Sequence, residues 1–252
     1  MRPPLLECKN VEFCEEDDTC LFQEVTFRLE AGQRGVMLAE PHRCATFLLK
    51  ICSTILPPSS GDVSWFGRSK EQMKKREFYQ LRRQIGYIHR ETSLISNMTI
   101  LDNISLGLQY HEEVVREQAY EDITELLEQF ELYDHRFLRP AELTFEQRRL
   151  AVYARELVKK PSLFLLEHPS LDLGERVYGL LLDVFKSCSI EYGCGFLVAS
   201  VVPEVVSRWG DWVLVFDEGR TKHFEADKFD PSIYREVMRR RGALLAREWR
   251  SE

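Results

Sequence analysis

The residues between 38 and 50 have the order of a phosphate-binding loop that joins a strand to a helix. Such a loop reads Gly, four residues, Gly, Lys and then Ser or Thr, because backbone N–H groups surround a phosphate and the Lys reaches it. The corresponding positions here are Ala39, Cys44, Ala45 and Thr46. Only the Thr46 hydroxyl meets the requirement, so the sequence predicts a loop that has lost most of its phosphate contacts.

Neighbouring residues of the loop bear on the same prediction. Glu40 adds a negative charge, and Pro41 has no N–H to donate. Hydrogen bonds to charged groups contribute ~1.5–3 kcal/mol each, so losing the Lys and a few loop contacts removes on the order of 5 kcal/mol. A micromolar site would then weaken to roughly millimolar. His42 and Arg43 favour the opposite conclusion, because an anion is stabilised at the start of a helix.

Composition places the chain among globular proteins. It has 252 residues, of which 44% are hydrophobic, and a formal net charge of −7. The acidic balance argues against a surface that binds nucleic acid, which would carry a basic stripe. No apolar run approaches the ~18 residues of a membrane span, and the first ten residues lack the apolar core of a signal peptide. We therefore expect a cytoplasmic protein.

The cysteines have no spacing typical of a metal site. There are seven, which is an odd number, and they are scattered along the chain. Their positions are Cys8, Cys14, Cys20, Cys44, Cys52, Cys188 and Cys194. This pattern predicts free thiols in a reducing compartment.

Strand and helix patterns alternate along the chain, which predicts a parallel sheet with both faces covered. Apolar and polar residues alternate over 6–13 and 25–29, as in two half-buried strands joined by an acidic turn. The apolar run 163–166 is typical of a strand buried on both faces. Thr144 to Gln147 fits a capping box at the start of a helix over 143–159. Further strands are expected at 34–38, 62–66, 85–88, 196–199, 212–216 and 220–224, and further helices at 46–53, 70–84, 100–130 and 177–188.

The order of these segments resembles the nucleotide-binding subunit of ATP-binding-cassette (ABC) transporters over roughly residues 5 to 226. Residues 82–88 look like the strand that enters the family's Gln loop, and 140–147 like the run that carries the signature motif. Residues 163–169 stand where the second phosphate motif belongs. Residues 200–205 resemble the switch region, and their sequence is most similar to that of the Mla/Mce lipid-transport ATPases.

Several residues depart from the motifs of the family that the chain resembles. The Gln of the Gln loop falls on Arg90, and the adenine-stacking aromatic on Glu15. Glu167 and His168 stand where the resemblance places a metal-side Asp and a catalytic Glu. The full set of motif positions that we regard as degenerate is Ala39, Cys44, Ala45, Thr46, Arg90, Thr144, Phe145, Glu146, Glu167, His168 and Val201.

The resemblance implies an α/β fold of the ABC type. It would have an N-terminal antiparallel β subdomain, a mostly parallel core sheet and a helical subdomain at about 90–150, all within residues 1–230. Residues 231–252 would form a helical tail that packs on the body or on a partner. The basic segment 70–83 is expected to be a solvated helix face, with contact to a membrane subunit as the alternative.

The departures predict a pseudo-ATPase, without catalytic residues and without bound ATP or Mg²⁺. The resemblance further implies assembly with a lipid-transport permease of Mla/Mce type at the inner face of the membrane, through a surface at 90–103. It also implies pairing with a second ABC chain or with itself, and the acidic net charge predicts no nucleic-acid partner. Two alternatives stay open: an ATPase with an unusual site built from Thr46, Glu167 and His168, and a free-standing regulatory protein.

Overall fold

The computed structural model describes residues 3–16, 19–39, 43–109, 116–171 and 173–248. Its centre is a six-stranded sheet in the order β10-β9-β3-β8-β7-β6. The strands are β3 (Arg34–Leu38), β6 (Ile85–Ile88), β7 (Leu163–Glu167), β8 (Gly195–Ser200), β9 (Trp212–Asp217) and β10 (Arg220–Glu225). Neighbouring strands are parallel except for β10, which runs antiparallel to β9 at one edge. The prediction of a mostly parallel core sheet is confirmed.

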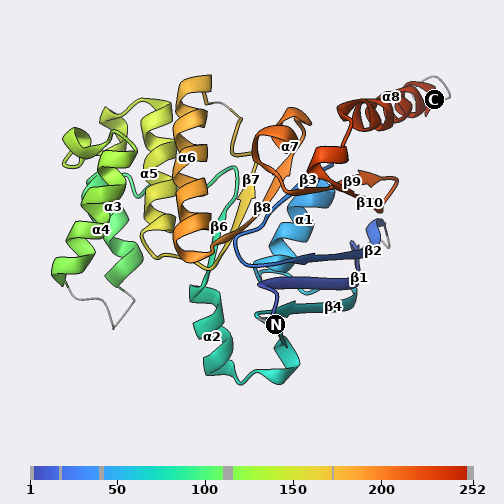
Figure 1. Cartoon of the computed structure of the whole chain (residues 1–252), viewed down its shortest axis with the longest axis horizontal. Coiled ribbons are helices and arrows are strands. Elements are labelled where there is room, and N and C mark those ends of the chain that lie inside the picture. The colour runs from blue at the N-terminus through green and yellow to red at the C-terminus, as the bar shows by residue number, and fades with distance from the viewer. Residues whose placement is uncertain (1–2, 17–18, 40–42, 110–115, 172, 249–252) are drawn as a thin grey trace.

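A second, antiparallel sheet lies beside the first and has the order β2-β1-β4-β5. Its strands are β1 (Leu6–Cys14), β2 (Cys20–Leu29), β4 (Ser60–Trp65) and β5 (Arg68–Ser69). Helix α1 (Arg43–Cys52) packs against both sheets (Figure 1). One buried cluster joins all three, with Leu6 and Phe22 from the antiparallel sheet, Leu48 from α1 and Leu165 from the central sheet. The N-terminal antiparallel subdomain is thus present as predicted.

The other face of the central sheet is covered by α5 (Phe145–Leu157) and α6 (Glu175–Tyr192). Phe164 and Phe196 of the sheet pack edge-on against each other at 5.7 Å, and both contact Phe185 of α6. Alternate residues of each central strand belong to the two different clusters, as the period of two along a strand requires. Both faces of the central sheet are buried, which explains the continuous apolar runs of these strands.

The predicted helical region 100–130 consists of α3 (Ile100–Gln109) and α4 (Arg116–Gln129), and the intervening residues lie outside the described part. Both helices lie at the end of the molecule that is far from the C-terminus, beyond α5 (Figure 1). The capping box at the start of α5 is confirmed, since Thr144 Oγ1 accepts the Gln147 N–H at 3.2 Å and the Gln147 side chain accepts the Thr144 N–H at 2.9 Å. The other helices are α2 (Lys75–Arg83), α7 (Glu204–Trp209) and α8 (Pro231–Glu248), with short 3₁₀ turns η1 (Lys70–Gln72), η2 (Tyr133–His135), η3 (Pro140–Glu142) and η4 (Ala226–Lys228).

Helix α8 contacts the body of the protein through its first half. Tyr234 and Val237 are buried, and the Arg235 guanidinium lies 2.5 Å from a Glu204 carboxylate oxygen of α7. The side chains of Leu244 and Leu245, which the sequence suggested for packing, lie outside the described part. No helix within the described ranges is both long and apolar enough to span a bilayer.

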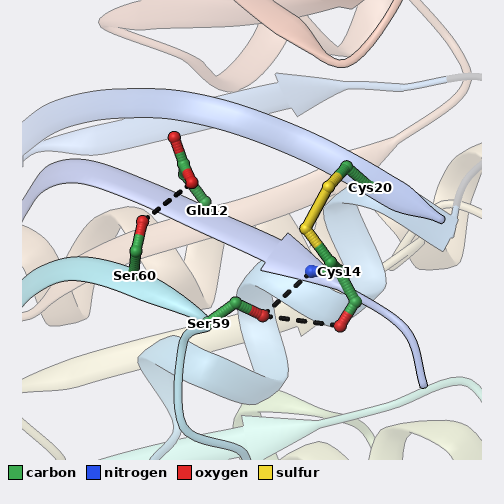
Figure 2. Close-up of a disulfide and its surroundings, with 5 residues drawn as sticks. All are labelled: Glu12, Cys14, Cys20, Ser59 and Ser60. Carbon is green, nitrogen blue, oxygen red and sulfur yellow. Dashed lines mark hydrogen bonds between the residues drawn. A yellow bond between two sulfur atoms is a disulfide. The ribbon is translucent and has the colours of Figure 1, made fainter. Parts of the chain in front are cut away.

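The prediction that all cysteines are free is wrong for one pair. Cys14 and Cys20 form a disulfide between the ends of β1 and β2 (Figure 2). The antiparallel pairing of the two strands places them opposite each other, whereas the sequence count treated each cysteine separately. The Ser59 hydroxyl accepts the Cys14 N–H at 2.9 Å, which ties this corner to the start of β4. The other five cysteines, all within the described ranges, are free and buried.

Candidate functional site

A pocket of about 440 Å³ opens where α1 begins and where β6 and β7 end. This is the carboxyl edge of the parallel sheet, where α/β proteins bind their ligands. Its lining residues are Arg43, Thr46, Phe47, Lys50, Ile55, Tyr87, His89, Arg90, Glu91, Glu167 and His168. The fold therefore brings together three of the segments that the sequence singled out, although they are far apart in the chain.

The wall formed by β6 and β7 is built around the carboxylate of Glu167. This side chain is only 6% exposed. The Tyr87 hydroxyl donates a hydrogen bond to Glu167 Oε1 at 3.2 Å, and the Arg90 N–H donates to Oε2 at 3.2 Å. Burial, followed by the nearby Glu167 charge, raises the pKa of Tyr87, so the phenol stays protonated and remains a donor. The carboxylate is held through both oxygens.

His168 follows Glu167 and lines the same pocket in a left-handed backbone conformation, with φ of 47°. Its N–H donates to the Ala199 carbonyl at 2.9 Å, and its carbonyl accepts the Leu171 N–H at 3.0 Å. Such conformations are rare for residues with a Cβ and are concentrated at functional sites. The two backbone hydrogen bonds on either side hold the imidazole at the end of β7.

The opposite wall is the first two turns of α1. The Arg43 guanidinium binds both carboxylate oxygens of Glu15, at 2.6 and 2.7 Å. Lys50 lies one turn beyond Thr46 on the same helix face, and its ammonium is 5.0 Å from the centre of the Phe47 ring. This wall supplies Arg43 and the Thr46 hydroxyl in the first turn of α1, where a helix N-terminus favours anions, and a second cation, Lys50, in the last turn.

Three residues of the expected phosphate loop serve packing instead. Ala39 and Ala45 are almost fully buried in the cluster between the two sheets. The Cys44 thiol donates to the Leu21 carbonyl at 3.2 Å, and burial raises its pKa. Residues 40–42, which include Glu40 and His42, lie outside the described part.

The signature and switch positions do not line this pocket. Thr144 caps α5, and Phe145 is 46% exposed beside it. Glu146 Oε1 accepts the N–H of Gly174 at 2.7 Å, so it joins the start of α5 to the start of α6. Val201 follows β8 and is half-buried.

Sequence reasoning missed Tyr87, Phe47 and Lys50. A helical wheel would have placed Lys50 beside Thr46, because residues four apart share a face. No local pattern pairs Tyr87 with Glu167, since the two are 80 residues apart and meet only through the β6–β7 pairing.

The chain is similar to several curated proteins. It is 28% identical over 196 residues to the methionine import ATP-binding protein MetN of Haemophilus influenzae, which covers 78% of the chain and 56% of that protein. It is 22% identical over 208 residues to the lipoprotein-releasing system ATP-binding protein LolD of Buchnera aphidicola, covering 81% and 91%. It is 25% identical over 244 residues to the phosphonates import ATP-binding protein PhnC 2 of Oceanobacillus iheyensis, covering 91% and 95%. The chain spans a little over half the length of the methionine import relatives.

Solved structures share the fold. CbiO1 from Clostridium perfringens, described as part of an ABC transporter complex, matches with a TM-score of 0.80 and 18% identity over 97% of each chain. An ATP-binding cassette solved as a dimer with ADP and Pi matches with a TM-score of 0.77 and 21% identity, covering 89% of this chain and 100% of that one.

These findings contradict the predicted pseudo-ATPase, and with it the predictions that the chain is no enzyme and binds neither ATP nor Mg²⁺. Relatives that cover about four fifths of the chain or more are named ATP-binding proteins. The Mla/Mce assignment is also wrong, because those relatives serve methionine, lipoprotein and phosphonate systems. The prediction was wrong because it judged each motif position separately. In the folded chain the pocket is lined by Arg43 and Lys50, two cations that do not stand at the Lys position of the motif.

The family itself is shown by a direct match. The family model described as ABC transporter matches residues 22–170, which is well over half of the chain. The matched residues run from β2 through α1, β6 and α5 to the end of β7, so they include both walls of the pocket. The chain belongs to the ABC transporter family.

Proposed function

We propose that the chain is the ATP-binding and ATP-hydrolysing subunit of a membrane transporter, with the nucleotide phosphates in the pocket between α1 and the ends of β6 and β7. The observation that carries this proposal is the composition of that one pocket. Cations and a hydroxyl line one wall, and a buried carboxylate and an imidazole line the other. Phosphoryl transfer depends on groups of these kinds.

The α1 wall would bind the phosphates. Thr46 offers a hydroxyl, and Arg43 offers positive charge at the start of a helix whose dipole has the same sign, while Lys50 adds a second cation from the last turn. A guanidinium can form paired hydrogen bonds with a phosphate, and Arg43 already donates from one Nη atom to both oxygens of the Glu15 carboxylate. Binding would therefore exchange the Glu15 carboxylate for phosphate oxygens at Arg43.

The donor set also fits Mg²⁺. This cation prefers oxygen ligands and usually keeps waters and substrate phosphates in its shell, so one or two protein oxygens suffice. Glu167 and Thr46 would hold it, and it would neutralise negative charge on the phosphates. Within the described ranges there is no group of three or more His, Cys, Asp or Glu residues arranged for a metal alone. A site shared with nucleotide agrees with that finding.

His168 would act on the attacking water. A neutral imidazole accepts a proton near physiological pH, and its place after Glu167 puts it at the carboxylate end of the pocket. We assign it the role of general base.

The transporter assembly is part of the same proposal. The relatives are named as parts of import or release systems, and a related cassette was solved as a dimer. We propose that residues 1–230 form the cassette, with its helical subdomain at about 90–150, and that this cassette is peripheral to a membrane subunit and pairs with a second cassette. Ile95 is 43% exposed on the segment 90–103, which agrees with a contact to the membrane subunit, whereas Leu94 packs on the core. Residues 231–252 are the tail.

The test is calorimetric titration with Mg-ATP, followed by phosphate release in single-turnover and steady-state assays. We expect saturable binding, and turnover that His168→Ala lowers by roughly 10²–10⁴-fold, the usual contribution of a general base. The control is Ile190→Ala, because Ile190 is 84% exposed on α6 and does not line the pocket. Absence of saturable binding up to several millimolar ATP would show that the pocket does not hold nucleotide.

A further inference from the structure

The carboxylate of Glu167 has a partner that no motif of the sequence explains. Tyr87 lies on β6, in register with Leu165 of β7, and its hydroxyl extends along the pair to Glu167. We propose that Tyr87 is a positioning residue, whose hydroxyl orients the Glu167 carboxylate for a divalent cation in the nucleotide pocket. The proposal rests on the proposed function and adds a residue to it.

About half of the lone-pair sites of the Glu167 carboxylate are used by its two hydrogen-bond donors. A carboxylate has about four lone-pair sites, and Glu167 uses one on each oxygen, for Tyr87 and for the Arg90 N–H. The remaining sites are free to bind a cation from the pocket, which Glu167 lines. Because each oxygen is fixed separately, the carboxylate plane cannot rotate without breaking a hydrogen bond.

The identity of Glu167 explains why such an anchor is needed. A glutamate has one more rotatable bond than an aspartate, so an unheld carboxylate would sample several positions. The two donors come from β6 and from the residues just after it, and β6 is paired with β7. The Tyr87 ring is itself packed, since it lies against the buried cluster and 5.9 Å from the His89 ring. The two groups that donate to Glu167 are therefore held in place by the paired strands.

Tyr87→Phe tests this inference because it deletes the hydroxyl and keeps the ring. Partners of this kind behind a metal ligand typically change metal affinity or activity by 10–100-fold when they are removed. We would measure binding of a fluorescent ATP analogue by the full chain, first in EDTA and then over a range of Mg²⁺ concentrations. The expected result is an unchanged affinity in EDTA, within about twofold, and a Mg²⁺ requirement raised by roughly 10–100-fold. Tyr79→Phe is the matched control, because Tyr79 is 53% exposed on α2 and away from the pocket lining.

The outcomes separate the two proposals. If wild-type protein binds the analogue and Tyr87→Phe has the wild-type Mg²⁺ requirement, the positioning role is wrong and the proposed function stands. If wild-type protein binds no analogue either in EDTA or at any Mg²⁺ concentration, the proposed function is wrong. A double-mutant cycle of Tyr87→Phe and Glu167→Ala in urea then decides whether the contact exists, and additive effects on the unfolding constant would overturn the inference without any nucleotide.

Discussion

The two walls of the pocket hold their charges in opposite ways. On the β6–β7 wall, the Glu167 carboxylate is buried, and two donors bind it through both oxygens. On the α1 wall, the Arg43 side chain is 51% exposed, and its partner Glu15 comes from the turn after β1, in a different sheet. The Glu167 charge is held by paired strands of the central sheet, and the Arg43 charge by an exposed contact between a helix and a turn.

This difference has an energetic consequence. A buried charge that loses its partners keeps the full cost of desolvation, so its contacts are worth several kcal/mol and rarely change. An exposed ion pair contributes only ~0–1 kcal/mol and is screened by salt. The pocket therefore combines a rigid β6–β7 wall with an adjustable α1 wall. The following changes should break or sharpen that contrast, from the largest effect to the smallest.

The largest effect is expected from Glu167→Ala. Loss of the buried carboxylate on the β6–β7 wall should weaken Mg²⁺-dependent nucleotide binding by at least ~100-fold, because a charge-assisted contact to a cation is lost. Glu91→Ala is the control, since Glu91 lines the same pocket but is exposed. Isothermal titration with and without Mg²⁺ measures both. Equal losses in the two variants would mean that burial and the two hydrogen bonds do not make Glu167 a better ligand than an exposed carboxylate of the same pocket.

Removing the disulfide should have the next largest effect, and on stability rather than on metal binding. The Cys14–Cys20 bond closes the turn that carries Glu15. Replacing both cysteines with serine should lower the free energy of unfolding by about 2 kcal/mol, the low end for disulfides because the closed loop is short. Urea denaturation with and without reductant measures it. The variant should not respond to reductant, whereas the parent protein should; a parent that is equally insensitive would contradict the pairing.

Arg43→Ala should affect binding and leave stability almost unchanged. Loss of one phosphate-side cation is expected to weaken nucleotide affinity by about tenfold, while the free energy of unfolding changes by less than ~1 kcal/mol because the ion pair is exposed. Arg176→Ala is a matched control, since Arg176 pairs with Glu131 on the surface away from the pocket. A large loss of stability in Arg43→Ala, but not in Arg176→Ala, would contradict the view that the α1 wall is adjustable.

The smallest effect is expected from Glu15→Gln, and it has the opposite sign. Removing the carboxylate that competes for Arg43 should strengthen nucleotide binding by about two- to threefold at low salt. The gain should disappear near 1 M salt, where charges are screened within ~3 Å. Titrations at several ionic strengths measure it. A gain that does not depend on salt would show that Glu15 acts by its shape and not by its charge.

The sequence by itself predicted the fold well, because the signals it used are local. The apolar run of β7, the alternation in β1 and the capping box at Thr144 each depend on residues within one segment. The order of such segments then indicated the ABC family, and the family match over residues 22–170 confirms it. Period and capping are properties of a few neighbouring residues, so they survive without knowledge of the tertiary structure.

The chemistry of the pocket was decided only by the tertiary structure. Tyr87 meets Glu167 across two paired strands, Arg43 of α1 meets Glu15 of the turn after β1, and Cys14 meets Cys20 across a hairpin. Motif positions scored in isolation predicted a lost site, because they could not include Lys50 or Tyr87, which reach the pocket from neighbouring positions. Charge, burial and hydrogen bonding are set by groups that are distant in sequence and adjacent in space, and these three quantities determine what a pocket can bind.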